Sequence, residues 1–206
     1  MRNLSKGKEL EDLCLYRLGK EDERGVAQGG RYGVQAVFDG VDATGRPKWM
    51  TIPSYPDIEG VLRGGRQFIF DAKVCSQSSL NLAGDHFRDR QFSHLKKRSR
   101  MGVVTFLLIH FNARELKKIH DAAVTWAFPV HHEMEFWLEF EAGAMRSISR
   151  DSCDKYAEQV SWSVMDRCRK ESPDIVDVVR RLSHRFDLPH GYEYGIQATV
   201  PVVRQT

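Results

Sequence analysis

The sequence predicts a mixed α/β fold in which a central β-sheet is flanked by helices. Leucines on one side of residues 7–18, with charged residues between them, indicate an amphipathic helix. Residues 103–111 (VVTFLLIHF) are apolar on both faces, which is typical of a central strand covered on both sides. Two pairs of short strand patterns around turn-forming residues indicate hairpins.

The first expected hairpin projects from the body. Its strands cover residues 34–39 and 49–52, on either side of the turn-rich sequence DATGRP. The second hairpin has strands over residues 57–63 and 67–74, with a Gly-Gly pair at the bend. The later elements are expected in this order: a helix capped by Asp85 and running to about Lys97, a strand near 124–128, helices at 131–141 and 150–160, and a separate helix at 173–185.

The composition is that of an ordinary globular protein. The 206 residues carry 31 Lys+Arg and 28 Asp+Glu, for a formal net charge of +3. No apolar run approaches the roughly 18–20 residues of a membrane-spanning helix, and no secretion signal follows the first positive charges. The 4 cysteines are widely spaced, which predicts free thiols. We therefore expect an intracellular, cytoplasmic protein without membrane contact.

The second hairpin carries the candidate chemistry. On a strand, alternate side chains share a face, so Asp71 and Lys73 point away from the apolar residues that flank them. A three-residue loop ending in a left-handed Gly65 pairs Leu62 with Arg66 and hence Asp57 with Asp71. A two-residue loop would instead put Asp57 on the wrong face. We predict the three-residue loop, because its third position requires glycine.

Two carboxylates on neighbouring strands, beside a lysine, form an oxygen-rich site suited to Mg²⁺, with Mn²⁺ as a substitute. Such an ion binds a phosphate oxygen, lowers the pKa of a bound water and stabilises the leaving oxygen. The ammonium of Lys73 can hold the attacking water or offset phosphate charge. Glu11, on the first helix, is a candidate third carboxylate. The alternative is a surface ion pair between Asp71 and Lys73, with Asp57 incidental.

A basic segment follows at residues 88–100. Its cations outnumber its single aspartate by more than the charge excess of the whole chain: Arg88, Arg90, Lys96, Lys97, Arg98 and Arg100. This pattern indicates a polyanion-binding surface. The alternative is a solvated helix end with its cations at the favourable terminus. Trp49, on the projecting hairpin, is a candidate for stacking on an exposed base, and packing within the hairpin explains it equally well.

These residues resemble the PD-(D/E)XK nuclease superfamily and, more narrowly, the RecU-type Holliday junction resolvases. The similar motifs are GxxLE at residues 7–11, PD at 56–57, DxxG at 57–60, FDAK at 70–73, RQxxHL at 90–95, the pair Phe136-Trp137, RSI at 146–148 and KY at 155–156. They occur in the order of that family. Asp71 stands where the family usually has Glu, and the hairpin looks shortened.

The resemblance implies a nuclease-like mixed sheet and a homodimer that nicks two strands of a four-way DNA junction, in DNA recombination and repair. The implied site roles are metal ligation by Glu11, Asp57, Asp71 and the Ala72 carbonyl, catalysis by Lys73, and support of the water or a phosphate by Gln91. A stalk at about residues 32–52 corresponds to the projecting hairpin. Arg31, Arg46 and Lys48 would bind DNA there.

The expected organisation is a nuclease domain over residues 1–171, followed by a C-terminal helix and tail of unknown role over 172–206. Two alternatives to junction resolution stay open, namely a nuclease acting on flaps, ends or duplexes, and a branched-DNA-binding protein that does not cut. The Gly-rich residues 25–33 lack a phosphate-loop pattern, so no nucleotide cofactor is expected. The sequence His131-His132-Glu133 is interpreted as a helix start, because adjacent histidines on a helix point apart.

Overall fold

The computed structural model describes residues 3–31, 35–52, 56–82, 91–116, 119–165 and 170–186. Its centre is a mixed six-stranded sheet, in which β5 and β7 are parallel and the other neighbours are antiparallel. In sheet order the strands are β1 (Ala27–Arg31), β4 (Ile58–Leu62), β5 (Gln67–Cys75), β7 (Val104–Phe111), β10 (Val124–Pro129) and β12 (Glu158–Gln159). The predicted mixed α/β class is confirmed.

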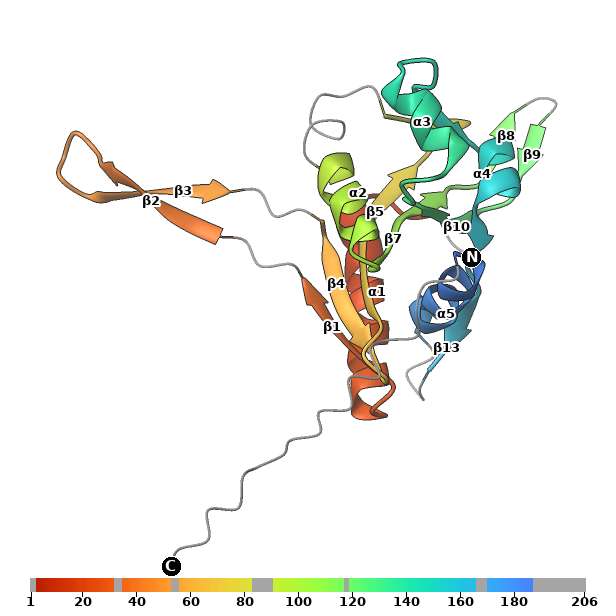
Figure 1. The fold of residues 1–206 in the computed structure, drawn as a ribbon, viewed down its shortest axis with the longest axis horizontal. Helices are drawn as coiled ribbons and strands as arrows, with labels where there is room; N and C mark the ends of the chain where they lie inside the picture. The colour runs from red at the N-terminus through yellow and green to blue at the C-terminus, as the bar shows by residue number, and fades with distance from the viewer. Residues whose placement is uncertain are drawn as a thin grey trace, which may run out of the picture.

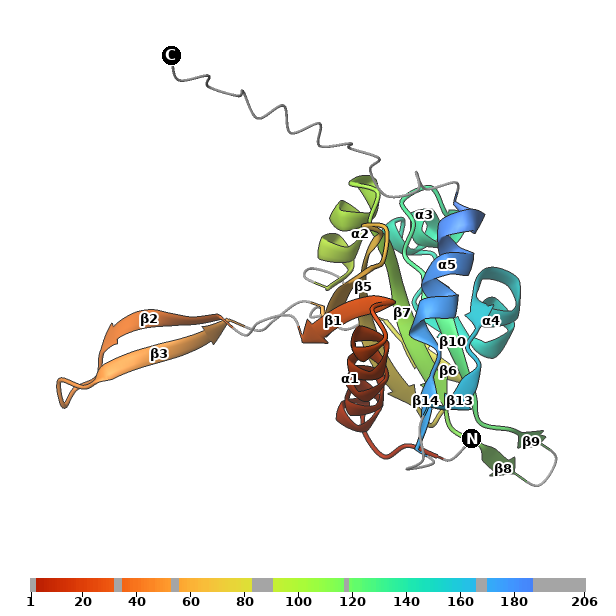
Figure 2. The same ribbon diagram turned by 90° about the horizontal axis from the view of Figure 1, so that it is seen from below.

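Helices cover both faces of this sheet (Figures 1 and 2). One apolar core joins the sheet to α1 (Gly7–Glu23) and α5 (Ile175–Arg185). The other core lies under α2 (Ser93–Arg100), α3 (Glu135–Glu141) and α4 (Arg150–Tyr156). The strand predicted at the centre, β7, is buried at every position, since it contributes to both cores. No described helix has the length and apolar character needed to cross a membrane.

Smaller two-stranded sheets surround the main one. The pair β2 (Gln35–Val41) and β3 (Pro47–Ile52) forms the first predicted hairpin, which stands away from the body in Figures 1 and 2. Its turn is held by Asp42, whose carboxylate accepts the backbone N–H groups of Thr44 and Arg46. The other pairs are β6 (Ser79–Asn81) with β11 (Ser147–Ser149), β8 (Arg114–Leu116) with β9 (Ile119–Asp121), and β13 (Trp162–Val164) with β14 (Glu171–Pro173).

Three predicted helix boundaries are wrong. The first helix continues past the expected residue 18 to Glu23. The helix expected at 131–141 begins only at Glu135, because His131 leaves the helical path and stacks on Phe186. The helix expected at 150–160 ends at Tyr156, where the chain extends to pair β12 with β10. The predicted cap Asp85 lies outside the described residues.

The C-terminal helix α5 is part of the main body and does not form the separate element that we expected. Its side chains Ile175, Val178, Val179 and Leu182 are fully buried in the core shared with α1. Asp174 caps the helix by accepting the backbone N–H of Asp177 at 3.1 Å. The amphipathic pattern of α5 therefore closes one face of the sheet.

Candidate active site

The hairpin of β4 and β5 has the predicted register. Gly60 pairs with Phe68 and Ile58 with Phe70, so the next position places Asp57 opposite Asp71. The loop is closed by a hydrogen bond from the Leu62 N–H to the Arg66 carbonyl at 2.9 Å. Gly64 and Gly65 have φ values of +98° and +86°, in the region that glycine adopts freely. Turn chemistry thus brings the two aspartates together, as the three-residue loop required.

Asp71 is the buried centre of the site. Its side chain is fully buried, and its Oδ1 accepts a hydrogen bond from Gln91 Nε2 at 3.0 Å. Its Oδ2 lies 2.5 Å from the ammonium nitrogen of Lys73 and makes no hydrogen bond of good geometry within the described residues. A carboxylate this deep requires compensation, which a single lysine and one amide supply only in part.

The carboxyl group of Asp57 completes the pair. Its Oδ2 accepts the backbone N–H of Ala72 at 2.8 Å, which fixes it at the end of the hairpin. Burial raises the pKa of Asp71 well above its usual range, Lys73 lowers it, and the adjacent Asp57 raises it further. The two carboxyls therefore resist being ionised together.

Glu11 joins this group from α1. Burial raises the pKa of Glu11, and the nearby Asp57 raises it further, whereas Arg31 and Lys73 lower it. Its Oε2 lies 3.5 Å from the guanidinium of Arg31. The structure thus brings together the three acids and the lysine that the sequence singled out.

The Ala72 carbonyl lies near the start of α1, 3.5 Å from the position that a Cβ on Gly7 would occupy. Carboxylate and carbonyl oxygens are the ligands that a hard divalent cation takes in proteins. The group contains three acids, Glu11, Asp57 and Asp71, beside Lys73, with Arg31 next to Glu11. Its donor atoms therefore suit a cation.

The predicted DNA-binding cations are found in different surroundings. Lys97 and Arg100 are exposed on α2, as are Arg46 and Lys48 on the β2–β3 hairpin. Lys96 instead forms an ion pair with Glu141 of α3. Arg88 and Arg90 lie outside the described residues, and of Trp49 the structure gives only its pairing with Phe38.

Arg31, expected at the stalk, ends β1 and binds Asp12 at 2.7 Å in addition to approaching Glu11. Its guanidinium therefore belongs to the edge of the acid cluster. Sequence reasoning missed this contact, because Asp12 and Arg31 are joined only by the packing of α1 on β1.

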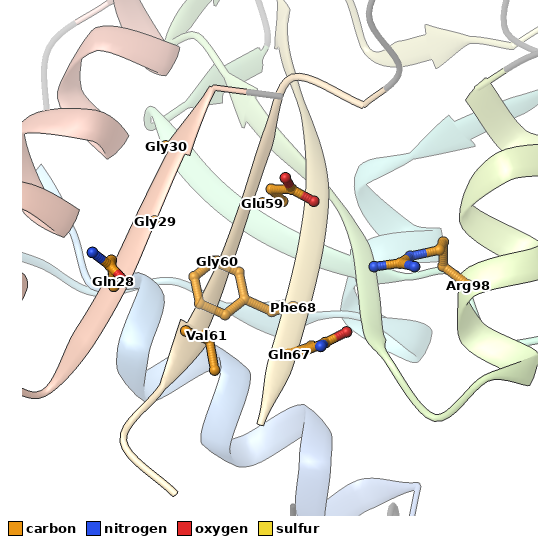
Figure 3. A pocket seen from close by; sticks show the side chains of 9 residues that line it. All are labelled: Gln28, Gly29, Gly30, Glu59, Gly60, Val61, Gln67, Phe68 and Arg98. Carbon is orange, nitrogen blue, oxygen red and sulfur yellow. The ribbon is translucent and has the colours of Figure 1, made fainter. Parts of the chain in front are cut away.

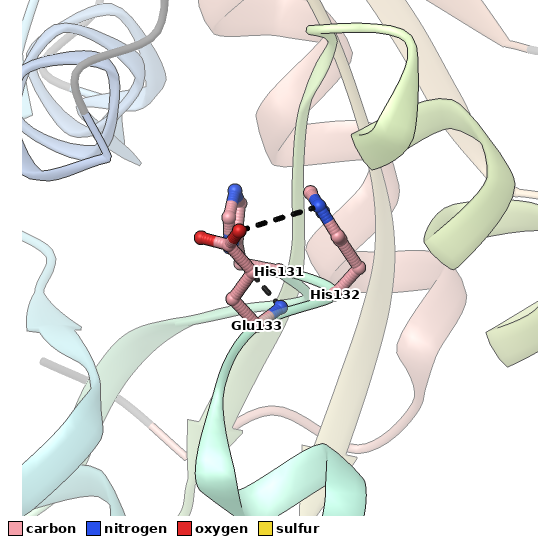
Figure 4. Close-up of side chains that lie close together, drawn as sticks. All are labelled: His131, His132 and Glu133. Atoms are coloured by element: carbon pink, nitrogen blue, oxygen red, sulfur yellow. Dashed lines mark hydrogen bonds and ion pairs between the residues drawn. The ribbon is translucent and has the colours of Figure 1, made fainter.

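A second polar cluster precedes α3 (Figure 4). The imidazole rings of His131 and His132 are 4.5 Å apart, and Glu133 Oε1 lies 3.9 Å from His132 Nε2. Because these residues form a turn, the expectation that the two histidines point apart is wrong. Burial, and next His132, lower the pKa of His131. The stacking of His131 on Phe186 at 4.4 Å gives this ring a packing role.

The fold and site define an α/β protein in which a hairpin of a mixed sheet carries an acid–acid–lysine cluster around a buried aspartate. Residues 47–168, more than half of the chain, match the family model RecU, described as Recombination protein U. The chain therefore belongs to the RecU family of recombination proteins, which confirms the resemblance seen in its motifs. The matched region contains Asp57, Asp71, Lys73 and Gln91, whereas Glu11 precedes it. No curated protein matches the chain.

Proposed function

We propose that this protein is a metal-dependent endonuclease that resolves four-way (Holliday) junctions by paired nicks, in DNA recombination and repair. Membership of a family of recombination proteins supports the biological setting. The observation that carries the chemistry is the pairing of Asp57 with Asp71 in the β4–β5 register, with Lys73 at 2.5 Å from Asp71. A protein that only binds DNA gains nothing from clustering acids where phosphates approach.

The proposed cofactor is Mg²⁺, with Mn²⁺ as a substitute. Glu11, Asp57, Asp71 and the Ala72 carbonyl would hold it, with Asp71 Oδ2 facing Lys73 and lacking a hydrogen bond of good geometry within the described residues. Burial first, and Asp57 in addition, raise the pKa of Asp71 and of Glu11, and a divalent ion bound to these carboxylates would stabilise their charged forms. When bound, such an ion lowers the pKa of a water molecule and stabilises the leaving oxygen.

The remaining groups hold charge and geometry in place. Gln91 positions the Asp71 carboxylate through its 3.0 Å hydrogen bond, and the Ala72 N–H does the same for Asp57. The ammonium of Lys73 is partly exposed, so it can face an attacking water or a phosphate oxygen while it remains next to Asp71. Lys73 is thus the catalytic amine, and Gln91 is a positioning residue.

We infer a homodimer, because a two-fold symmetric enzyme presents two equal sites to a nearly symmetric junction. The exposed cations of the β2–β3 hairpin, Arg46 and Lys48, are then available to the DNA near the branch point. Contacts of this type go to phosphates, so affinity depends on salt and recognition depends on the shape of the junction.

The test is cleavage of an immobile four-way junction, with each strand labelled in turn, in Mg²⁺, Mn²⁺ or EDTA. Asp71→Asn and Lys73→Ala should abolish metal-dependent cutting while junction binding survives. The matched controls are Glu23→Gln and Lys20→Ala, which remove the same charges from an exposed ion pair at the end of α1. These controls should cut normally.

Full cutting by Asp71→Asn or Lys73→Ala would refute the assigned roles. A panel of flap, duplex and single-stranded substrates separates a junction resolvase from a nuclease for another DNA form. Binding of branched DNA without cutting in either metal would identify a protein of DNA architecture.

A further inference from the structure

A groove of about 510 Å³ lies beside the acid cluster, between α2 and the outer strands β1 and β4 (Figure 3). Glu59, two residues after Asp57, lines it from β4, and Arg98 reaches it from α2. Gln28 and Gln67 add amide groups to its walls. Asp57 directly precedes β4 and Gln91 lies two residues before α2, so the elements that line the groove begin at the candidate active site.

Arg98 is the unusual residue of this groove. Its Nε is buried and has no hydrogen-bond partner, and no described carboxylate lies within ion-pair distance of its guanidinium. Two other arginines are bound to acids, namely the buried Arg17 to Asp174 at 2.8 Å and the partly buried Arg181 to Glu158 at 2.7 Å. A half-buried guanidinium without an acid partner indicates a site for an external anion.

Bare backbone forms much of the wall opposite Arg98. A Cβ on Gly29 would contact Leu18 of α1, so the alternation of the strand turns Gly30 to the opposite side, toward the groove. A Cβ on Gly30 would meet nothing within 4 Å. The groove is therefore open at this point only because no side chain fills it.

We propose that this groove holds the backbone of the DNA strand that is cut, with Arg98 bound to a phosphate next to, but not at, the scissile bond. The inference rests on the proposed nuclease function and adds the path of the strand. Arg98 lies seven residues after Gln91 along the helical segment, or about 10 Å at 1.5 Å per residue.

The charges along the groove agree with this path. Burial first, and Arg98 next, lower the pKa of His94, whereas Glu59 raises it, so Arg98 and Glu59 each lie near His94. The carboxylate of Glu59 repels a phosphate at the end of the groove next to Asp57. At that end a bound metal ion would be the charge that attracts the DNA. The phosphate is thereby confined to the Arg98 end.

The experiment compares Arg98→Gln and Gly30→Val with Arg100→Gln, which removes an exposed charge from the same helix. Junction binding is measured by fluorescence anisotropy in EDTA at several salt concentrations, and nick positions are mapped with Mg²⁺. Arg98→Gln should weaken binding about tenfold and spread the nicks over neighbouring bonds. Arg100→Gln should cause a smaller loss that salt screens, with the nick position kept.

Gly30→Val should unfold at the temperature of the wild type, because its side chain enters open space. The same side chain should weaken junction binding. If the valine variant unfolds, Gly30→Ala replaces it. The inference would be overturned if Arg98→Gln binds the junction as tightly as Arg100→Gln does. It would also be overturned if a folded Gly30 variant keeps the binding and the nick position of the wild type. A partner other than DNA in this groove gives that same negative result. Absence of cutting by the wild type refutes the nuclease function instead, while the binding comparison still tests the groove.

Discussion

Gly60→Ala tests how β1 and β4 are packed beside the site. A Cβ at position 60 would stand 2.4 Å from Phe68 Cζ and 2.5 Å from the backbone oxygen of Gln28. The Phe68 ring is 1% exposed and packs on Phe70, with centroids 6.3 Å apart, so it has little room to move. The Gln28 oxygen belongs to β1, which can yield only by separating from β4.

The expected loss is at the upper end of the 1–3 kcal/mol that overpacking causes, or about 3 kcal/mol in the free energy of unfolding. For a chain of this length, that corresponds to a Tm lower by roughly 6–12 °C. Gly30→Ala, whose Cβ meets nothing within 4 Å, is the control and should stay within about 1 kcal/mol of the wild type. Urea unfolding and thermal scans measure both. Equal stability of the two variants would refute this account of the packing.

Three further predictions concern the site and the core. The raised pKa of Asp71 means that the folded state keeps a proton that the unfolded state releases above about pH 4. The free energy of unfolding in EDTA should therefore fall as the pH rises from about 4 through that raised pKa. Asp71→Asn should reduce this fall. An unchanged pH profile in this variant would contradict the raised pKa of Asp71. Gln91→Ala should lower cleavage about 10–100-fold with junction affinity retained, because it releases the Asp71 carboxylate; wild-type kinetics would deny Gln91 a positioning role. Leu182→Ala should cost about 2–5 kcal/mol in urea unfolding, since Leu182 is fully buried; a loss under 1 kcal/mol would show that α5 is dispensable to the core.

Local sequence rules predicted the centre of the site. The pairing of Asp57 with Asp71 follows from a loop that places Gly65 where a left-handed residue is required. The buried strand β7 follows from an apolar run on both faces. Both features depend on residues that are close in the chain, which is why a single sequence is enough to predict them.

Contacts between distant segments were beyond the same reasoning. The ring of Phe186, at the end of α5, stacks on His131 just before α3, a contact between segments 55 residues apart in the sequence. The apolar stripe of α5 was visible in the sequence, but no local rule says which face of the sheet it covers. The approach of Arg31 to Glu11 likewise depends on how α1 packs on β1.

The partner of a charge is even harder to predict. Lys96 and Arg98 are two residues apart in one basic segment, yet Lys96 binds Glu141 whereas Arg98 has no acid within reach in the described part of the chain. From composition alone, both residues are predicted to bind a polyanion. Only the surroundings on α3 and in the groove distinguish a structural ion pair from a candidate phosphate ligand.

The charges of the site and of the groove support one sequence of events along the proposed strand path. When ionised, the acids of the site repel a phosphodiester as well as one another, and burial first, then the nearby Asp57, raise the pKa of Asp71 and of Glu11. A divalent ion would relieve both repulsions at once, so metal and scissile phosphate would favour each other's binding by the same free energy. Arg98 attracts the strand in the groove, whose lining includes none of the three acids of the site. In this view the groove can bind DNA before the metal is in place, and the metal then decides whether the bound strand is cut.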